Sequence, residues 1–118
     1  QAFAQYAVAK AEALVESGSL YLRQSIADIW RDVQIGAAAD LAQRARARRA
    51  CVQAAEASAE AVDLSCRAAG GHALFQSYPF ERALRDVRGA IAQITLQRST
   101  MEDAGRVAFG LSPASPTF

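Results

Sequence analysis

The most constraining feature of this sequence is a long helical pattern, from about Ala38 to Ala69, whose inward positions carry mostly small side chains. These positions recur in steps of four and three, which is the spacing of one face of an α-helix. Only an arginine interrupts the seam, whose predicted members are Leu41, Ala45, Arg48, Val52, Ala55, Ala59, Val62, Cys66 and Ala69. Because small side chains let helices approach closely, the seam predicts a nearly antiparallel helix packed against it.

The expected neighbour is a helix from Phe3 to about Gln34, where apolar residues again recur at helical spacing. Its interior Gly18 costs up to about 1 kcal/mol relative to alanine, but the missing side chain allows a neighbouring helix to come close. We therefore expect one continuous helix. Gly36 should end it as a left-handed C-terminal cap.

Two further helices are expected after the double glycine Gly70-Gly71. The third should run from Pro79 to about Gln97, with a core side made of Phe80, Leu84, Val87, Ile91 and Ile94. Ser99 should cap a last short helix, with Glu102 and Asp103 in its first turn and Gly110 at its end. The sequence thus predicts an all-α, four-helix up-down-up-down bundle over residues 1–111, followed by an extended, loosely held tail over residues 112–118.

Bulk properties limit the classes of function. The chain has 118 residues and a net charge of +1, which predicts one domain and gives no reason to expect nucleic acid or a membrane as a partner. Cys51 and Cys66 would lie roughly 22 Å apart on one helix, so we expect two thiols in a reducing, cytoplasmic compartment. The chain begins at Gln1 in the middle of a helical pattern, and we expect it to be part of a longer protein.

Few residues could carry chemistry of their own. His72 is the single histidine and has no acidic or thiol neighbour at ligand spacing, so we expect a turn residue rather than a metal ligand or a proton shuttle. The arginine cluster at positions 44–49 spreads around its helix, which favours a solvated or interface-pairing surface over nucleic-acid binding. We assign no catalytic or metal-binding residue.

The segment after Pro79 is more specific. Glu81 lies one helical turn before Arg85, and Arg82 lies one turn before Asp86, which predicts two ion pairs side by side. If these pairs are partly buried beside Leu84, they would fix the geometry of the helix and of the loop before it.

A family resemblance follows from the combined pattern. Arg67-Ala68-Ala69-Gly70-Gly71, followed by Tyr78-Pro79-Phe80-Glu81-Arg82 and Arg85-Asp86, resembles the C-terminal helical domain of the acyl-CoA dehydrogenases, in the branch that includes the two-component flavin monooxygenases. The resemblance covers nearly the whole chain. It implies a four-helix bundle that forms the core of a homotetramer and completes a flavin site shared between subunits. The number of large aromatic side chains independently predicts self-association, as a dimer or tetramer: Phe3, Tyr6, Tyr21, Trp30 and Phe109.

The resemblance also implies cofactor contacts. Gly70 and Gly71 would meet FAD (or FMN) through backbone N–H groups, because a residue without Cβ permits close approach. Arg67 would lie beside them, at a place where dehydrogenases often have glutamine. For each glycine alone, a simple helix cap is an equally weighted alternative.

Two departures bear on activity. Ile94 stands where many acyl-CoA dehydrogenases have their catalytic glutamate, and Gln93 stands where the monooxygenase branch commonly has histidine; neither can act as a general base. The family's N-terminal and middle domains have no counterpart in this chain, so we expect it to be inactive alone. The alternative reading is a free-standing helical assembly module without a cofactor.

Overall fold

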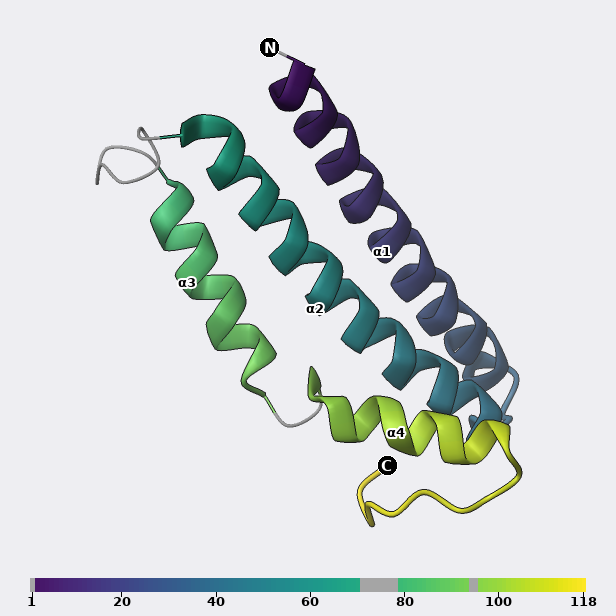
Figure 1. Ribbon diagram of the computed structural model, residues 1–118. Coiled ribbons are helices and arrows are strands. Elements are labelled where there is room, and N and C mark those ends of the chain that lie inside the picture. The colour runs from purple at the N-terminus through teal and green to yellow at the C-terminus, as the bar shows by residue number, and fades with distance from the viewer. Residues whose placement is uncertain (1, 71–78, 94–95) are drawn as a thin grey trace.

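The structure, a computed structural model, describes residues 2–70, 79–93 and 96–118. The regular elements in these ranges are four helices, α1 (Ala2–Gln34), α2 (Leu41–Ala69), α3 (Phe80–Ile91) and α4 (Arg98–Ala108). Figure 1 shows α1 and α2 as a long antiparallel hairpin, with α3 along the other side of α2 and α4 crossing near the loop of the hairpin. The predicted all-α fold with four helices is confirmed.

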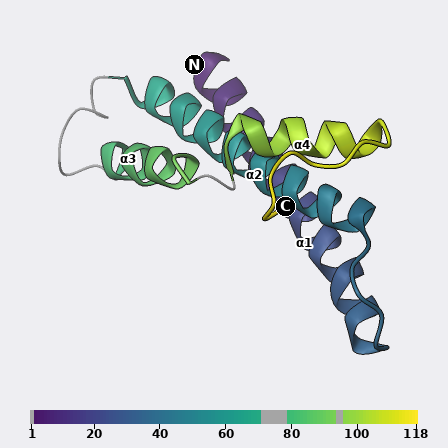
Figure 2. The ribbon, with the colours of Figure 1, turned by 90° about the horizontal axis from the view of Figure 1, so that it is seen from below.

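Helix α2 is the centre of the arrangement. It packs against α1, α3 and α4, whereas within the described ranges α1 contacts neither α3 nor α4. Figure 2 shows α4 lying across α2 rather than along it. The buried residues of α2 are Ala45, Ala50, Val52, Ala57, Ala61 and Leu64. Only two of these, Ala45 and Val52, belong to the predicted seam. The prediction gave this helix one neighbouring helix, whereas the structure gives it three.

The contact between α1 and α2 is close at Gly18. This glycine is buried, and a Cβ built on it would lie 3.4 Å from Ala54 Cα and 3.5 Å from Ala57 Cβ. The continuous first helix and the close approach are therefore confirmed. The face of α2 that meets α1 includes Ala54 and Ala57, which the predicted seam omitted.

The two ends that form the hairpin loop have well-defined caps. Gly36 has a φ of 85° at the end of α1, as predicted. Helix α2 begins at Leu41, later than the predicted Ala38, because Asp40 caps it. The backbone N–H of Gln43 donates to Asp40 Oδ1 at 2.7 Å, and the N–H of Asp40 donates to Gln43 Oε1 at 3.1 Å, which together form a capping box.

Two of the predicted boundaries of the last two helices are wrong, namely the end of the third helix and the start of the fourth. Helix α3 ends at Ile91 instead of Gln97, where a tight bond from the Gln93 N–H to the Ala90 carbonyl, 3.1 Å long, closes its last turn. Helix α4 is preceded by Gln97 as N-cap, with no side-chain capping bond, so Ser99 is not the cap. Gly110 follows its end with a φ of 78°.

Asp103 and the tail also differ from expectation. Asp103 lies within α4, past its first turn, and is buried. Its two carboxylate oxygens accept hydrogen bonds from the backbone N–H groups of Ala114, at 2.8 Å, and Ser115, at 3.1 Å. Arg106 Nε donates to the Ser112 carbonyl at 2.7 Å. The tail is therefore hydrogen-bonded to α4 rather than loosely held.

None of the helices in residues 2–70, 79–93 and 96–118 combines the length and apolar content needed to cross a membrane. Cys51 and Cys66 are not joined by a disulfide, as expected from their separation.

Candidate functional site

The C-terminal end of α2 carries the described part of the predicted cofactor site. Gly70 caps the helix with φ 64° and ψ −138°, a conformation that L side chains rarely adopt. Its N–H donates to the carbonyls of Arg67 and Cys66, so the helix end already uses this donor. Gly70 is exposed, and no described residue other than its chain neighbours lies within 4 Å of a Cβ built on it. Gly70 therefore acts as a helix cap at an exposed position.

Arg67 lies one turn before this cap. Its side chain is 60% exposed, and Nη1 lies 3.8 Å from Asp63 Oδ2 in a long ion pair. The guanidinium also lies over the ring of Phe3, 5.3 Å from the ring centroid. Arg67 thus links the free ends of α1 and α2 and still presents a cationic group to solvent. Gly71 and His72, the other residues singled out in this segment, lie outside the described residues.

The charged first turns of α3 are only partly as predicted. Arg85 Nη2 lies 3.2 Å from Glu81 Oε1, with both side chains more than half exposed. The second predicted pair, between Arg82 and Asp86, is not formed, although the structure describes both residues. Exposed pairs of this kind contribute only a few tenths of a kcal/mol, so the partial burial on which a role in fixing the helix geometry depended is not found.

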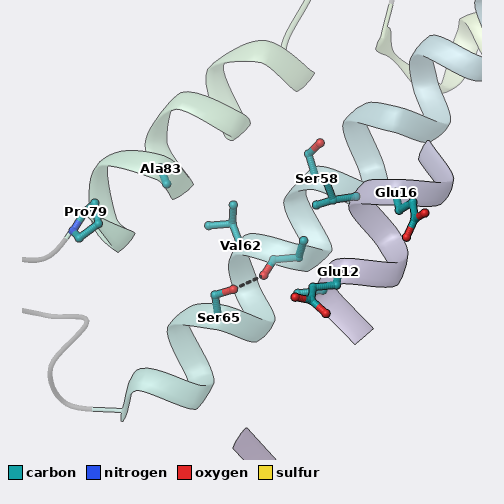
Figure 3. A pocket seen from close by; sticks show the side chains of 10 residues that line it. Glu12, Glu16, Ser58, Val62, Ser65, Pro79 and Ala83 are labelled. Carbon is teal, nitrogen blue, oxygen red and sulfur yellow. Dashed lines mark hydrogen bonds between the residues drawn. The ribbon is translucent and has the colours of Figure 1, made fainter. Parts of the chain in front are cut away.

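An open groove runs between α1 and α3, with α2 as its floor. Its volume is about 870 Å³, and its lining is mostly apolar. Figure 3 shows Glu12 and Glu16 on the α1 wall, Ser58, Val62 and Ser65 on the floor, and Pro79 and Ala83 on the α3 wall. The Ser65 hydroxyl on this floor donates to the Ala61 carbonyl at 2.8 Å, so its hydrogen-bond donor is already paired with the backbone of α2.

A smaller groove of about 420 Å³ adjoins the first one at Ser58. Leu22 contributes from α1, Cys51 from α2, and Asp86 and Val87 from α3. Neither groove was predicted from the sequence, because each arises from the space that the packed helices leave between them.

The described residues offer little catalytic chemistry. Gln93 is exposed in the turn after α3, and its neutral amide cannot act as a base; Ile94 lies outside the described residues. Among the described residues, no group of three or more His, Cys, Asp or Glu side chains could hold a metal ion. The carboxylates in the grooves are Glu12, Glu16 and Asp86, and they lie on two opposite walls.

Most side chains of the arginine cluster of α2 form contacts within the chain. Arg46 Nη1 lies 2.5 Å from Asp28 Oδ2, and Arg49 Nε donates to the Tyr21 hydroxyl at 2.7 Å. The hydrogen bond from Arg46 is the largest cause that lowers the pKa of Asp28, followed by the hydrogen bond from Gln24. Three of the four arginines in this cluster contact α1 or the tail, as the interface-pairing alternative predicted: Arg46, Arg48 and Arg49.

Comparison with known proteins gives consistent results. The family described as acyl-CoA dehydrogenase, C-terminal domain, matches residues 1–98. An indole-3-acetate monooxygenase from Acinetobacter baumannii is 29% identical over 110 residues, which are 93% of this chain and 28% of that protein. The crystal structure of a 3-HSA hydroxylase from Rhodococcus sp. RHA1 has the same fold, with a TM-score of 0.91 and 23% sequence identity, and the match covers 98% of this chain and 31% of that one.

The chain therefore spans less than a third of the length of these two relatives. The family match extends through α1, α2 and α3, and the fold likeness includes α4. This chain belongs to the family of the acyl-CoA dehydrogenase C-terminal domain.

Proposed function

We propose that this chain is the C-terminal helical domain of a flavin-dependent oxidoreductase and that it completes a flavin site across a subunit interface. The observation that carries the proposal is the family match over residues 1–98, which includes the α2 end with Arg67 and Gly70. The chain is inactive alone in this proposal, because the remaining two thirds of a protein of this kind would supply most contacts to flavin and substrate.

The residues at the end of α2 fit such a role. A flavin dinucleotide is anionic at its phosphates, and Arg67 presents a largely exposed guanidinium that can pair with phosphate. No described residue other than its chain neighbours lies within 4 Å of a Cβ built on Gly70, and a residue without Cβ permits close approach. Because the Gly70 N–H is donated to α2, this residue would contact the cofactor through its Cα and carbonyl oxygen. The expected contact from Gly71 remains part of the proposal.

The bound flavin, FAD or FMN, would supply the electron transfer, and this chain would contribute only binding and orientation. Neither Gln93 nor Ile94 can take up a proton, so either a general base comes from another part of the protein or the flavin reaction needs none from this domain. Gln93 and Ile94 depart from the patterns of the monooxygenase branch and of the dehydrogenases alike, so they do not distinguish the two reactions. We propose a monooxygenase because an indole-3-acetate monooxygenase is 29% identical to this chain over 110 residues.

Self-association is the second part of the proposal. Several large apolar side chains are more than 40% exposed on the single chain, among them Phe3, Tyr6, Trp30 and Phe109. A dimer or tetramer would cover them, and we propose such an assembly in the cytoplasm, where Cys51 and Cys66 would remain thiols. This surface also favours the alternative of an assembly module without a cofactor.

Flavin binding by the full-length protein tests the proposal. We expect the product of the complete reading frame to bind FAD or FMN, measured by titration of flavin fluorescence, and the 118-residue chain alone not to bind. Arg67→Ala should weaken the binding about tenfold, which corresponds to one charge-assisted hydrogen bond. Arg67→Gln, the family's common residue, is the matched control and should bind more tightly than Arg67→Ala. Absence of flavin binding in both the oxidised and reduced states would rule the proposal out.

A further inference from the structure

Helix α4 has little apolar packing of its own to hold it in place. Two of its 11 residues are buried, Asp103 and Ala104, and one of them is acidic. Among the described helices, α2 alone contacts α4. A helix of this length is marginal in water when it is isolated. The position of α4 therefore depends on contacts beyond the small apolar surface that it buries.

The chain reverses direction directly after α4. The N–H of Leu111 donates to the Arg106 carbonyl at 2.8 Å, and the N–H of Gly110 donates to the Val107 carbonyl at 3.0 Å, which together form a Schellman motif. Figure 2 shows the following residues running back alongside α4, so that the C-terminus lies near α2. Residues 112–118, which we call the strap, thus pass from one helix to the other.

The α4 end of the strap is held by Asp103. This buried carboxylate accepts from the N–H groups of Ala114 and Ser115, with one oxygen for each. About one turn further along α4, Arg106 donates to the Ser112 carbonyl. Because hydrogen bonds to a charged group are stronger than those between neutral groups, this end supplies the larger share of the attachment.

The α2 end of the strap is held by Arg48. Its Nη2 donates to the Thr117 carbonyl at 3.1 Å, and its guanidinium carbon lies 6.0 Å from the centroid of the Phe118 ring. Between the two ends the strap bonds to itself. The N–H of Thr117 donates to Ser115 Oγ at 3.3 Å, and Ser115 Oγ lies 3.0 Å from Thr117 Oγ1. The attachment therefore continues from Asp103 to Arg48 without a break.

We propose that residues 112–118 form a cooperative strap that fixes α4 on α2, and that the strap opens as one unit when either end is released. The contacts at one end are a few hydrogen bonds or a single bond with a ring contact. Their net contribution is smaller than the conformational entropy lost when the whole strap is ordered. Both ends are therefore needed to keep the strap closed, and an open strap leaves α4 with its small apolar contact alone.

The strap is separate from the proposed flavin site and does not depend on it. It follows residues 1–98, which match the family, so the family match does not account for it. Arg48 and Arg67 lie on the same helix, roughly 28 Å apart along its axis. We therefore expect flavin binding by the full-length protein to be unchanged when the strap opens.

A double-mutant cycle followed by hydrogen exchange tests the strap in the full-length protein. The amides of α4 report on its attachment, because a released helix of this length loses its protection. We expect Asp103→Ala and Arg48→Ala each to raise the exchange rate of these amides at least about tenfold. The double variant should exchange no more than about twofold faster than the faster single variant, because the strap is already open. Independent contacts would instead multiply the two increases.

Arg44→Ala is the matched control, since Arg44 is an exposed arginine of α2 outside the strap contacts. It should leave the α4 amides unchanged, and it should add nothing to the effect of Asp103→Ala. Multiplied increases in the cycle, or unchanged α4 protection in either single variant, would overturn the strap. An equal loss of protection in α1 would do the same, because the whole bundle would then open rather than the strap alone.

Discussion

The two halves of the α1–α2 hairpin are held together by different kinds of contact. In the loop half, where residues 21–34 meet residues 41–49, polar side chains cross from one helix to the other. Asp28 accepts from Arg46, Asp32 accepts from the Gln43 amide at 2.6 Å, and the Tyr21 hydroxyl accepts from Arg49. These contacts are directional, so they fix the register of the two helices.

In the free half, where residues 2–18 meet residues 54–69, the helices meet mainly through glycine and alanine. Gly18 faces Ala54 and Ala57, and the described side-chain contact between the helix ends is the guanidinium of Arg67 over Phe3. Small residues bring the helices close but add little specificity of their own. The free half therefore depends on shape and the loop half on polar contacts, and substitutions should affect the two halves differently.

The largest expected effect comes from filling the close contact of the free half. Gly18→Leu would place a side chain where Ala54 Cα is only 3.4 Å from a built Cβ, and we expect a loss of about 2–3 kcal/mol in the free energy of unfolding. Gly18→Ala is the matched control. Its Cβ fits at ordinary contact distance, and its better helix propensity should make it neutral or stabilising by up to about 1 kcal/mol. Urea unfolding followed by circular dichroism measures both, and equal stability of the two variants would contradict the close packing.

The next largest effect on stability is expected where the C-terminal tail covers the loop half of the hairpin. Arg48 of α2 donates to the Thr117 carbonyl at 3.1 Å and lies 6.0 Å from the centroid of the Phe118 ring, so the tail covers this part of α2. Asp103→Ala removes both oxygens that accept from the Ala114 and Ser115 amides, and we expect a loss of about 2 kcal/mol in the free energy of unfolding.

Hydrogen exchange of individual backbone amides tests whether Asp103 holds the tail. The amides of Ala114 and Ser115 donate to Asp103, so their protection should fall strongly in Asp103→Ala, while α1 should be unaffected. Asp103→Ser, which keeps one short acceptor, is the milder control. Unchanged protection of these two amides would show that the tail is held by other contacts.

Some features of the hairpin were predictable from the sequence, and others were not. Periodicity was sufficient to predict four helices, the continuity of α1 through Gly18 and the Gly36 cap, because these depend on local spacing and backbone conformation. The inward face of α2 was predicted poorly, since one stripe cannot represent a helix with neighbours on three sides. Ala57, which faces Gly18, is a small residue whose burial only the tertiary arrangement decides.

In the candidate site, too, local features were predictable from the sequence and tertiary features were not. The motif around Gly70 was recognisable because its glycine is required by a positive φ, which is a local property. The grooves were not predictable, because they arise from the space between α1 and α3 above α2. The role of Asp103 was also mistaken, since it depends on a tail that returns to α4 from beyond the helix end.

A smaller effect should appear in the loop half as the pH falls. The pKa of Asp28 is lowered, first by its hydrogen bond from Arg46, so its carboxylate is more stable in the folded state than in the unfolded chain. Its contribution to stability is present above the ordinary pKa of about 4 and is lost as the pH falls through the lowered folded value. Asp28→Asn should therefore reduce the urea midpoint at pH 7 and reduce the fall of this midpoint below about pH 4. An identical acid profile in both proteins would contradict this assignment.

The smallest effect on folding stability is expected at Arg67, at the end of the free half. Variants at this end can distinguish a contribution to stability from a contribution to flavin binding. Arg67 contributes an exposed ion pair 3.8 Å long and a cation–π contact, so Arg67→Ala should cost only about 0.5 kcal/mol of folding stability. Phe3→Leu removes the same ring contact without removing the cation, and it should cost a similar amount in the same urea experiment. If Arg67→Ala weakens flavin binding by the full-length protein and Phe3→Leu does not, the loss belongs to the guanidinium and not to the packing of the helix ends. Equal weakening by both variants would instead assign Arg67 a purely structural role.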